Sequence, residues 1–200
     1  MPQASNTEIR YGNVAMALHW LIALLAIGNL CSGLTFAQLM SHDNPWRFTI
    51  IQTHKSIGLT ILVLSVIRLI WRLMNRVPPL PLEMSAPLKF VARLTHYLFY
   101  FLIIAIPLAG WLLVSASPTG IPTMYFGLFP WPNLPFFDGL TRPERAHYTH
   151  TFAAAHSYMA FLTIALVLLH VAAALYHQFI RRDNVLRRMW FGTQVRSVPR

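Results

Sequence analysis

Histidines inside apolar stretches are the residues of this sequence best suited to chemistry. The chain has nine histidines, and four of them lie within long apolar runs: His19, His54, His156 and His170. A side chain that can ionise or bind a metal is costly inside a bilayer, so a function is the first explanation for its presence there. Imidazole is a common metal ligand and titrates near neutral pH. These four side chains are therefore the first candidates for a metal or cofactor site.

Four apolar runs would carry these histidines, and they cover residues 14–39, 54–74, 95–117 and 152–180. A helix needs about 20 residues to cross the hydrocarbon of a membrane, and each run supplies that length. Hydrophobic residues make up 56% of the chain and charged residues only 11%, against about 25% charged in a soluble domain. The first run exceeds the ~7–15 apolar residues of a signal peptide, so we expect it to be retained. The sequence predicts an all-α membrane protein: a bundle of four transmembrane helices forming one domain over residues 1–200.

Basic residues are distributed unequally between the two sides of the predicted membrane. Of the 16 Lys and Arg, four flank the spans on one side, namely Arg47, Lys55, Arg142 and Arg145. The other twelve flank the opposite side: Arg10, Arg68, Arg72, Arg76, Lys89, Arg93, Arg181, Arg182, Arg187, Arg188, Arg196 and Arg200. The positive-inside rule then predicts that both termini are cytoplasmic. The basic excess reflects topology, and no soluble basic module remains that would bind nucleic acid.

The four histidines fall into two pairs by depth in the membrane. His170 follows His156 by 14 residues on the fourth span, which is about 21 Å along a helix and within about 40° of the same face. His19 is near the cytoplasmic start of its span, at the depth of His170. His54 begins the second span on the outer side, at the depth of His156.

Two stacked haems, each held by two imidazoles from facing helices, would require this layout. A zinc site is less suited, because it prefers help from Cys or carboxylate, whereas Cys31 stands alone and no acidic residue lies within these spans. The sequence has no Cys-x-x-Cys-His attachment motif, so we expect two non-covalent haem b groups. The alternative is a haem-free membrane interaction or transport protein, in which the histidines only form hydrogen bonds between helices.

Several motifs of the chain resemble the bacterial cytochrome b561 family, and they are spread over nearly the whole length of the chain. They are Ala17-Leu18-His19-Trp20-Leu21, Thr53-His54-Lys55-Ser56-Ile57-Gly58, Val66-Ile67-Arg68-Leu69-Ile70-Trp71-Arg72, His96-Tyr97, Ile106-Pro107-Leu108-Ala109-Gly110-Trp111, Ala155-His156, Leu169-His170-Val171-Ala172-Ala173-Ala174-Leu175-Tyr176-His177 and Arg182-Asp183-Asn184.

The resemblance implies a di-haem b cytochrome of the bacterial inner membrane that exchanges electrons with ubiquinone. By this resemblance, His19 and His170 would ligate the cytoplasmic-side haem, and His54 and His156 the periplasmic one. At least one branch of the family oxidises periplasmic superoxide and passes the electron to quinone, so the donor would be superoxide or a reduced redox protein. The alternative function is a haem b membrane subunit that passes electrons between quinone and a separate dehydrogenase or hydrogenase.

Five further residues are candidates for roles near these haems. His96 and His177 lie at the cytoplasmic ends of their spans, where imidazoles could hydrogen-bond the two carbonyls of a quinone and relay protons. The alternative is that both only anchor span ends at the headgroups. Arg68 and Arg72 could pair with haem propionates or extend toward lipid phosphate. Lys55 could pair with an outer propionate or attract an anion, although four basic residues face three acidic ones on that side, so no strong electrostatic funnel is evident.

The longest connection, residues 116–151, lies on the outer side and is rich in Pro, Phe and Trp. Aromatic rings of this kind favour the membrane interface. We expect a loop or cap against the membrane, with direct substrate binding as the alternative.

Overall fold

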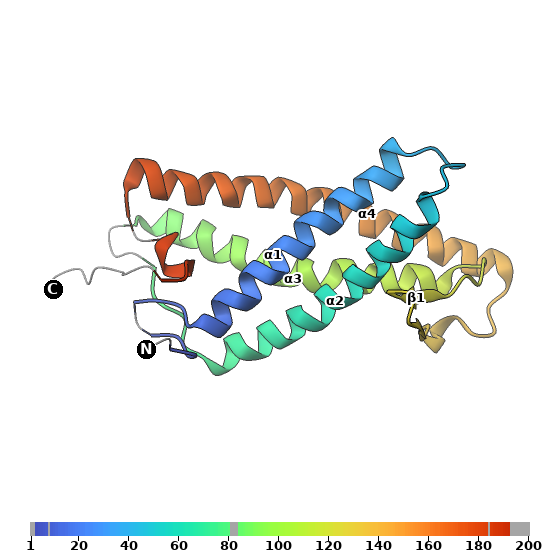
Figure 1. The fold of residues 1–200 in the computed structure, drawn as a ribbon, viewed down its shortest axis with the longest axis horizontal. Coiled ribbons are helices and arrows are strands. Elements are labelled where there is room, and N and C mark those ends of the chain that lie inside the picture. Colours follow the sequence, from blue (N-terminus) through green and yellow to red (C-terminus); the bar gives the residue numbers. More distant parts are fainter. Residues whose placement is uncertain (1–2, 8, 81–83, 184, 193–200) are drawn as a thin grey trace.

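The computed structural model describes residues 3–7, 9–80, 84–183 and 185–192. Asn184, Arg196 and Arg200, used in the sequence arguments, lie outside these residues. Four long helices run side by side and form an elongated bundle (Figure 1). In chain order the elements are α1 (Asn13–Leu34), η1 (Thr35–Leu39), α2 (Arg47–Met74), α3 (Ala86–Ala116), β1 (Thr123–Tyr125), β2 (Phe129–Trp131), η2 (Pro135–Phe137), α4 (Arg142–Tyr176), η3 (His177–Arg181) and η4 (Arg187–Met189).

Each of the four helical segments is long and apolar enough to cross a membrane. Large apolar side chains point outward along them; Leu24, for example, is 73% exposed and Leu168 is 67% exposed. In water this surface would be unfavourable, whereas hydrocarbon solvates it without cost. Small polar residues are buried instead, including Ser56, Ser65 and Thr163, as is usual where membrane helices approach closely.

The helices extend beyond the apolar runs of the sequence, mainly at their N-terminal ends. Polar residues continue a helix once it has been nucleated, and hydropathy does not mark where it begins. α4 begins ten residues before the apolar run because Thr141 and Glu144 form a capping box at its N-terminus. α3 begins at Ala86 with Pro87 in its first turn, where proline is tolerated because its missing N–H needs no partner.

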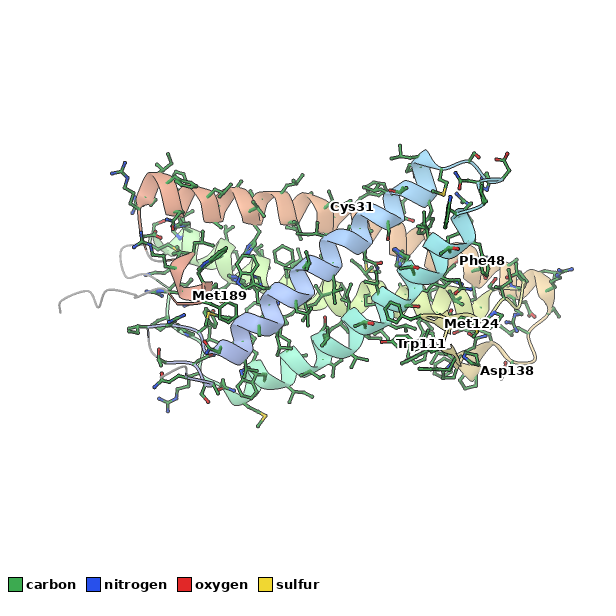
Figure 2. All side chains as sticks on the ribbon, viewed as in Figure 1. Cys31, Phe48, Trp111, Met124, Asp138 and Met189 are labelled. Atoms are coloured by element: carbon green, nitrogen blue, oxygen red, sulfur yellow. The ribbon has the colours of Figure 1, made fainter. Side chains whose placement is uncertain are left out.

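The connection between α3 and α4 forms a small β-hairpin at one end of the bundle, which we call the hairpin end (Figure 1). Figure 2 shows Trp111, Met124 and Asp138 at this end, opposite Met189. The hairpin is tied to α2: the Ser56 hydroxyl accepts from the Phe126 N–H (2.9 Å), and its own hydrogen is shared between the Gln52 carbonyl (2.9 Å) and the Met124 carbonyl (3.2 Å). The aromatic loop predicted from the sequence is therefore a cap on the helices, with ordered strands.

Two arginines at the hairpin end bind the carbonyl ends of helices. The Arg145 guanidinium donates to the carbonyls of Ser115 (3.0 Å) and Ser117 (3.2 Å) at the end of α3. Arg47 donates in the same way to the carbonyls of Phe36 and Met40 after α1. A cation at a helix C-terminus satisfies orphan carbonyls and interacts favourably with the helix dipole. Two of the four basic residues on this side thus form structural hydrogen bonds with backbone carbonyls.

The opposite end of the bundle, which we call the termini end, holds the N-terminal and C-terminal segments together (Figure 1). The Trp20 indole N–H donates to the Met189 carbonyl (2.7 Å), and Arg10 donates to the Trp190 carbonyl (2.8 Å). Arg188 donates to the carbonyl of Pro79 in the connection between α2 and α3 (2.6 Å). These hydrogen bonds join the two terminal segments and the connection between α2 and α3 at this end of the bundle.

Candidate functional site

The four histidines predicted from depth meet as two pairs inside the bundle. The ring centres of His54 on α2 and His156 on α4 are 6.1 Å apart, with ring planes at 71°. Those of His19 on α1 and His170 on α4 are 6.5 Å apart, with planes at 75°. Each pair joins a histidine from the α1–α2 half of the bundle to one from α4. The first is the outer pair, toward the hairpin end, and the second is the inner pair, toward the termini end.

Both ring separations suit two imidazoles that share one metal ion. Imidazole nitrogens bound to opposite sides of a metal at about 2 Å place their ring centres roughly 6 Å apart. The outer pair also borders a cavity of about 400 Å³ whose walls come from all four helices and from Thr123 of β1. The cavity lining is mostly aliphatic, as a flat, apolar macrocycle requires. The residues present therefore fit a haem with two axial histidines.

Each histidine of the outer pair is anchored to a neighbouring helix. His54 Nδ1 lies 3.1 Å from the Asn29 carbonyl of α1 and 3.0 Å from the Ser32 hydroxyl. His156 Nδ1 lies 2.9 Å from the Ile106 carbonyl of α3. A carbonyl can only accept, so Nδ1 carries the hydrogen and Nε2 is left as the ligand nitrogen.

The inner pair has a third histidine beside it. The ring centre of His96 is 6.1 Å from that of His170, so His170 has imidazole neighbours on two sides. The sequence placed His96 at the start of its span, but α3 begins ten residues earlier, and His96 therefore lies within the bundle. Phe99, one turn further along α3, also contacts the His170 ring, with ring centres 5.4 Å apart.

Arg68 and Arg72 bring two positive charges close to the histidines of the termini end, Arg68 to the inner pair and Arg72 to His96. Both guanidinium groups lie over the Tyr100 ring, 5.3 Å and 4.9 Å from its centre. The Arg68 charge is close enough to act on both histidines of the inner pair. Tyr11 lies near Arg72, and burial raises the pKa of its phenol, so this group stays neutral at pH 7. Neither arginine has an acidic partner among the described residues, and an anionic group such as a propionate would complement both charges.

The remaining candidates are placed separately. Lys55 lines the cavity beside His54. His177 Nδ1 is 2.5 Å from the Asp183 carboxylate, in a hydrogen bond that was not predicted from the sequence, although the two residues are six apart at a helix end. No direct contact joins His177 to His96 in the described part of the chain, so the structure does not bring these two together.

Four apolar helices with histidines paired across their interior define a class of protein: a membrane-embedded cytochrome b. Residues 10–192 match the family described as prokaryotic cytochrome b561. The chain is 33% identical over 186 residues to cytochrome b561 homolog 2 of Escherichia coli (strain K12), covering 92% of this chain and 93% of that protein. It is 29% identical over 182 residues to the probable superoxide oxidase CybB of Yersinia pestis, covering 90% and 95% of the two chains. The chain belongs to the prokaryotic cytochrome b561 family.

Family membership confirms the fold class and the membrane location predicted from the sequence. The protein is a multi-pass protein of the bacterial inner membrane whose four-helix bundle carries b-type haem. It acts in transmembrane electron transfer as a cytochrome b.

Proposed function

We propose that the chain binds two b-type haems and carries single electrons between a periplasmic donor and ubiquinone. The observation that carries this proposal is the pair of histidine pairs, with ring centres 6.1 Å and 6.5 Å apart. His54 and His156 would hold the outer haem, and His19 and His170 the inner one. Each haem, when bound, would supply a one-electron iron couple. α4 contributes to both sites, 14 residues apart, which separates them by about 21 Å along the helix.

The orientation in the membrane assigns each site to a compartment. In the sequence, twelve of the sixteen basic residues flank the predicted spans on the same side as the two termini, which supports a cytoplasmic location for that side. The outer pair then faces the periplasm and the inner pair the cytoplasm.

The cytoplasmic half offers groups for quinone chemistry. His96 lies beside His170, where it could hydrogen-bond a quinone carbonyl close to the inner site. His177, hydrogen-bonded to Asp183 and with its side chain 21% exposed, could relay protons between the cytoplasm and the quinone. Two electrons and two protons convert one quinone to its quinol.

Superoxide is the donor that we propose for the periplasmic side. A relative of the chain is named a probable superoxide oxidase, and Lys55 places a positive charge on the cavity wall next to His54. Superoxide would give up one electron and leave as dioxygen, so two superoxide anions would reduce one quinone. Because Arg47 and Arg145 are bound to carbonyls, Lys55 is the cation best placed to attract the anion.

Reconstitution into ubiquinone-containing liposomes tests this proposal. We expect purified protein to show two b-type haems in reduced-minus-oxidised spectra and to form quinol when superoxide is generated outside the vesicles. His54→Ala should remove one haem, spare the other and abolish quinol formation. A haem-free protein would refute the proposal. A di-haem protein that is inactive with superoxide would refute this donor and favour the membrane subunit of a dehydrogenase or hydrogenase.

A further inference from the structure

The two outer histidines share an anchoring geometry, although they lie on different helices. In both cases Nδ1 faces a backbone carbonyl within a neighbouring helix, that of Asn29 for His54 and that of Ile106 for His156. Both carbonyls belong to residues within a helix, and the imidazole N–H approaches them from outside that helix. The Asn29 carbonyl also accepts from the Ser32 hydroxyl (2.9 Å), which lies 3.0 Å from His54 Nδ1, so hydroxyl and carbonyl share the His54 hydrogen. The histidine N–H therefore reaches an atom that side chains normally cover.

A glycine follows each of these carbonyls by four residues and exposes it. In an α-helix the carbonyl of residue i points toward residue i+4, whose Cβ tilts back over it. A Cβ at Gly33 would lie 3.1 Å from His54 Cε1. A Cβ at Gly110 would lie 3.2 Å from His156 Cε1 and 3.3 Å from its Nδ1. An alanine at either position would thus push the imidazole away from its carbonyl.

The inner pair lacks this arrangement. His19 Nδ1 is buried and has no hydrogen-bond partner among the described residues. The Nδ1 hydrogen bond to a carbonyl matters for a ligand, because it fixes the ring orientation and makes the opposite nitrogen a stronger electron donor. The outer and inner pairs therefore differ in the hydrogen bonds of their imidazoles, although both pairs consist of histidines in the same bundle.

We propose that Gly33 and Gly110 are positioning residues for the outer haem: they let His54 and His156 donate to helix carbonyls, which strengthens both ligands and lowers the potential of that haem. This inference rests on the proposed function, in which the outer pair binds a haem. Stronger donation stabilises ferric over ferrous iron, so weakening it should raise the potential of the outer haem and leave the inner one unchanged.

The test compares Gly33→Ala and Gly110→Ala with Gly28→Ala. Gly28 is also on α1, and nothing lies within 4 Å of a Cβ built there. Spectroscopic redox titration and low-temperature electron paramagnetic resonance would be recorded, with His156→Ala identifying the signals of the outer haem. We expect the first two variants to lose about tenfold or more in outer-haem affinity. A tenfold loss of affinity that is confined to the ferric haem corresponds to a rise of about 59 mV in the reduction potential of this one-electron couple.

Gly28→Ala should match the wild type, and the inner haem provides a control within each molecule. Unchanged outer potentials and g values in both variants, or equal shifts of both haems, would overturn the inference. If these variants lose both haems by misfolding, Ser32→Ala decides, because it removes the hydroxyl 3.0 Å from His54 Nδ1 without adding an atom. A rise of the outer potential in that variant supports the inference, and no change overturns it. A wild-type protein without an outer haem would instead refute the proposed function.

Discussion

His170 has two imidazole neighbours, and either of them could share the proposed inner haem with it. The ring centres of His19 and His96 lie 6.5 Å and 6.1 Å from that of His170, so distance alone does not separate them. His96 lies on α3, which packs along the helix of His170, whereas His19 approaches from α1 in the other half of the bundle. The positions of His19 and His170 along their spans also predict a similar depth for the two residues. We therefore propose His19 as the second haem ligand and His96 as a residue that binds the quinone.

Replacing each histidine by alanine separates these roles. We expect His19→Ala to retain one haem per chain instead of two, because the inner haem loses an axial ligand. His96→Ala should retain two haems and lose most quinone reduction. The ratio of haem to protein, measured as the pyridine haemochrome, checks the first expectation, and quinol formation in liposomes checks the second. Two haems in His19→Ala and one haem in His96→Ala would instead show that His96 is the ligand.

At the scale of elements, α2 holds the hairpin that caps the outer cavity. Phe126 has a positive φ of 48°, which is strained for a residue with a side chain. Its N–H donates to the Ser56 hydroxyl, and its ring contacts Tyr125, with ring centres 4.8 Å apart. Ser56 is fully buried, so water cannot replace the hydroxyl at low cost. The buried serine thus maintains a strained turn over the cavity.

Ser56→Ala should loosen the hairpin while preserving the helices. The change leaves the Phe126 N–H without its acceptor, which costs about 1–3 kcal/mol. We expect hydrogen exchange in residues 123–131 to become on the order of tenfold faster, as measured by mass spectrometry in detergent. Thr53→Ala is the matched control, because Thr53 is exposed on the same helix and its hydroxyl bonds only the Thr49 carbonyl. Equal exchange in the two variants would contradict this role of Ser56.

At the scale of the whole molecule, the histidines would join the α1–α2 half of the bundle to the α3–α4 half. α1 packs along α2 and α3 along α4, and α2 also packs along α3, so the two halves already touch through these middle helices. Each histidine pair takes one ring from each half. A haem bound between such rings would connect the halves, and haem binding should stabilise the assembled bundle by mass action.

Orientation also belongs to the whole molecule, and cysteine labelling can determine it. The chain has one cysteine, Cys31, which is exposed and would be replaced by serine. In this background we expect Asp138→Cys to react with a membrane-impermeant maleimide in intact spheroplasts. Arg181→Cys should react only after permeabilisation, since the positive-inside rule places the termini end in the cytoplasm. The opposite labelling pattern would reverse the proposed direction of the electron path.

Much of this architecture could be predicted from the sequence, because it depends on hydropathy and on the regular geometry of a single helix. The apolar runs identify the spans, and the rise and angle per residue place His156 and His170 at two depths on nearly one face. Helix ends were harder to predict, because capping groups such as Thr141 and Glu144 begin α4 well before its apolar run.

The sequence by itself therefore determined the number of spans, the membrane environment and the separation of His156 and His170 along α4, all of which follow from local backbone geometry and hydropathy. Only the tertiary structure decided which groups meet across helices. It placed His96 beside His170, aimed His54 and His156 at carbonyls exposed by glycines, and bound Arg145 to the end of α3. These contacts depend on how the helices are rotated and packed against one another, which the spacing along a single helix does not contain.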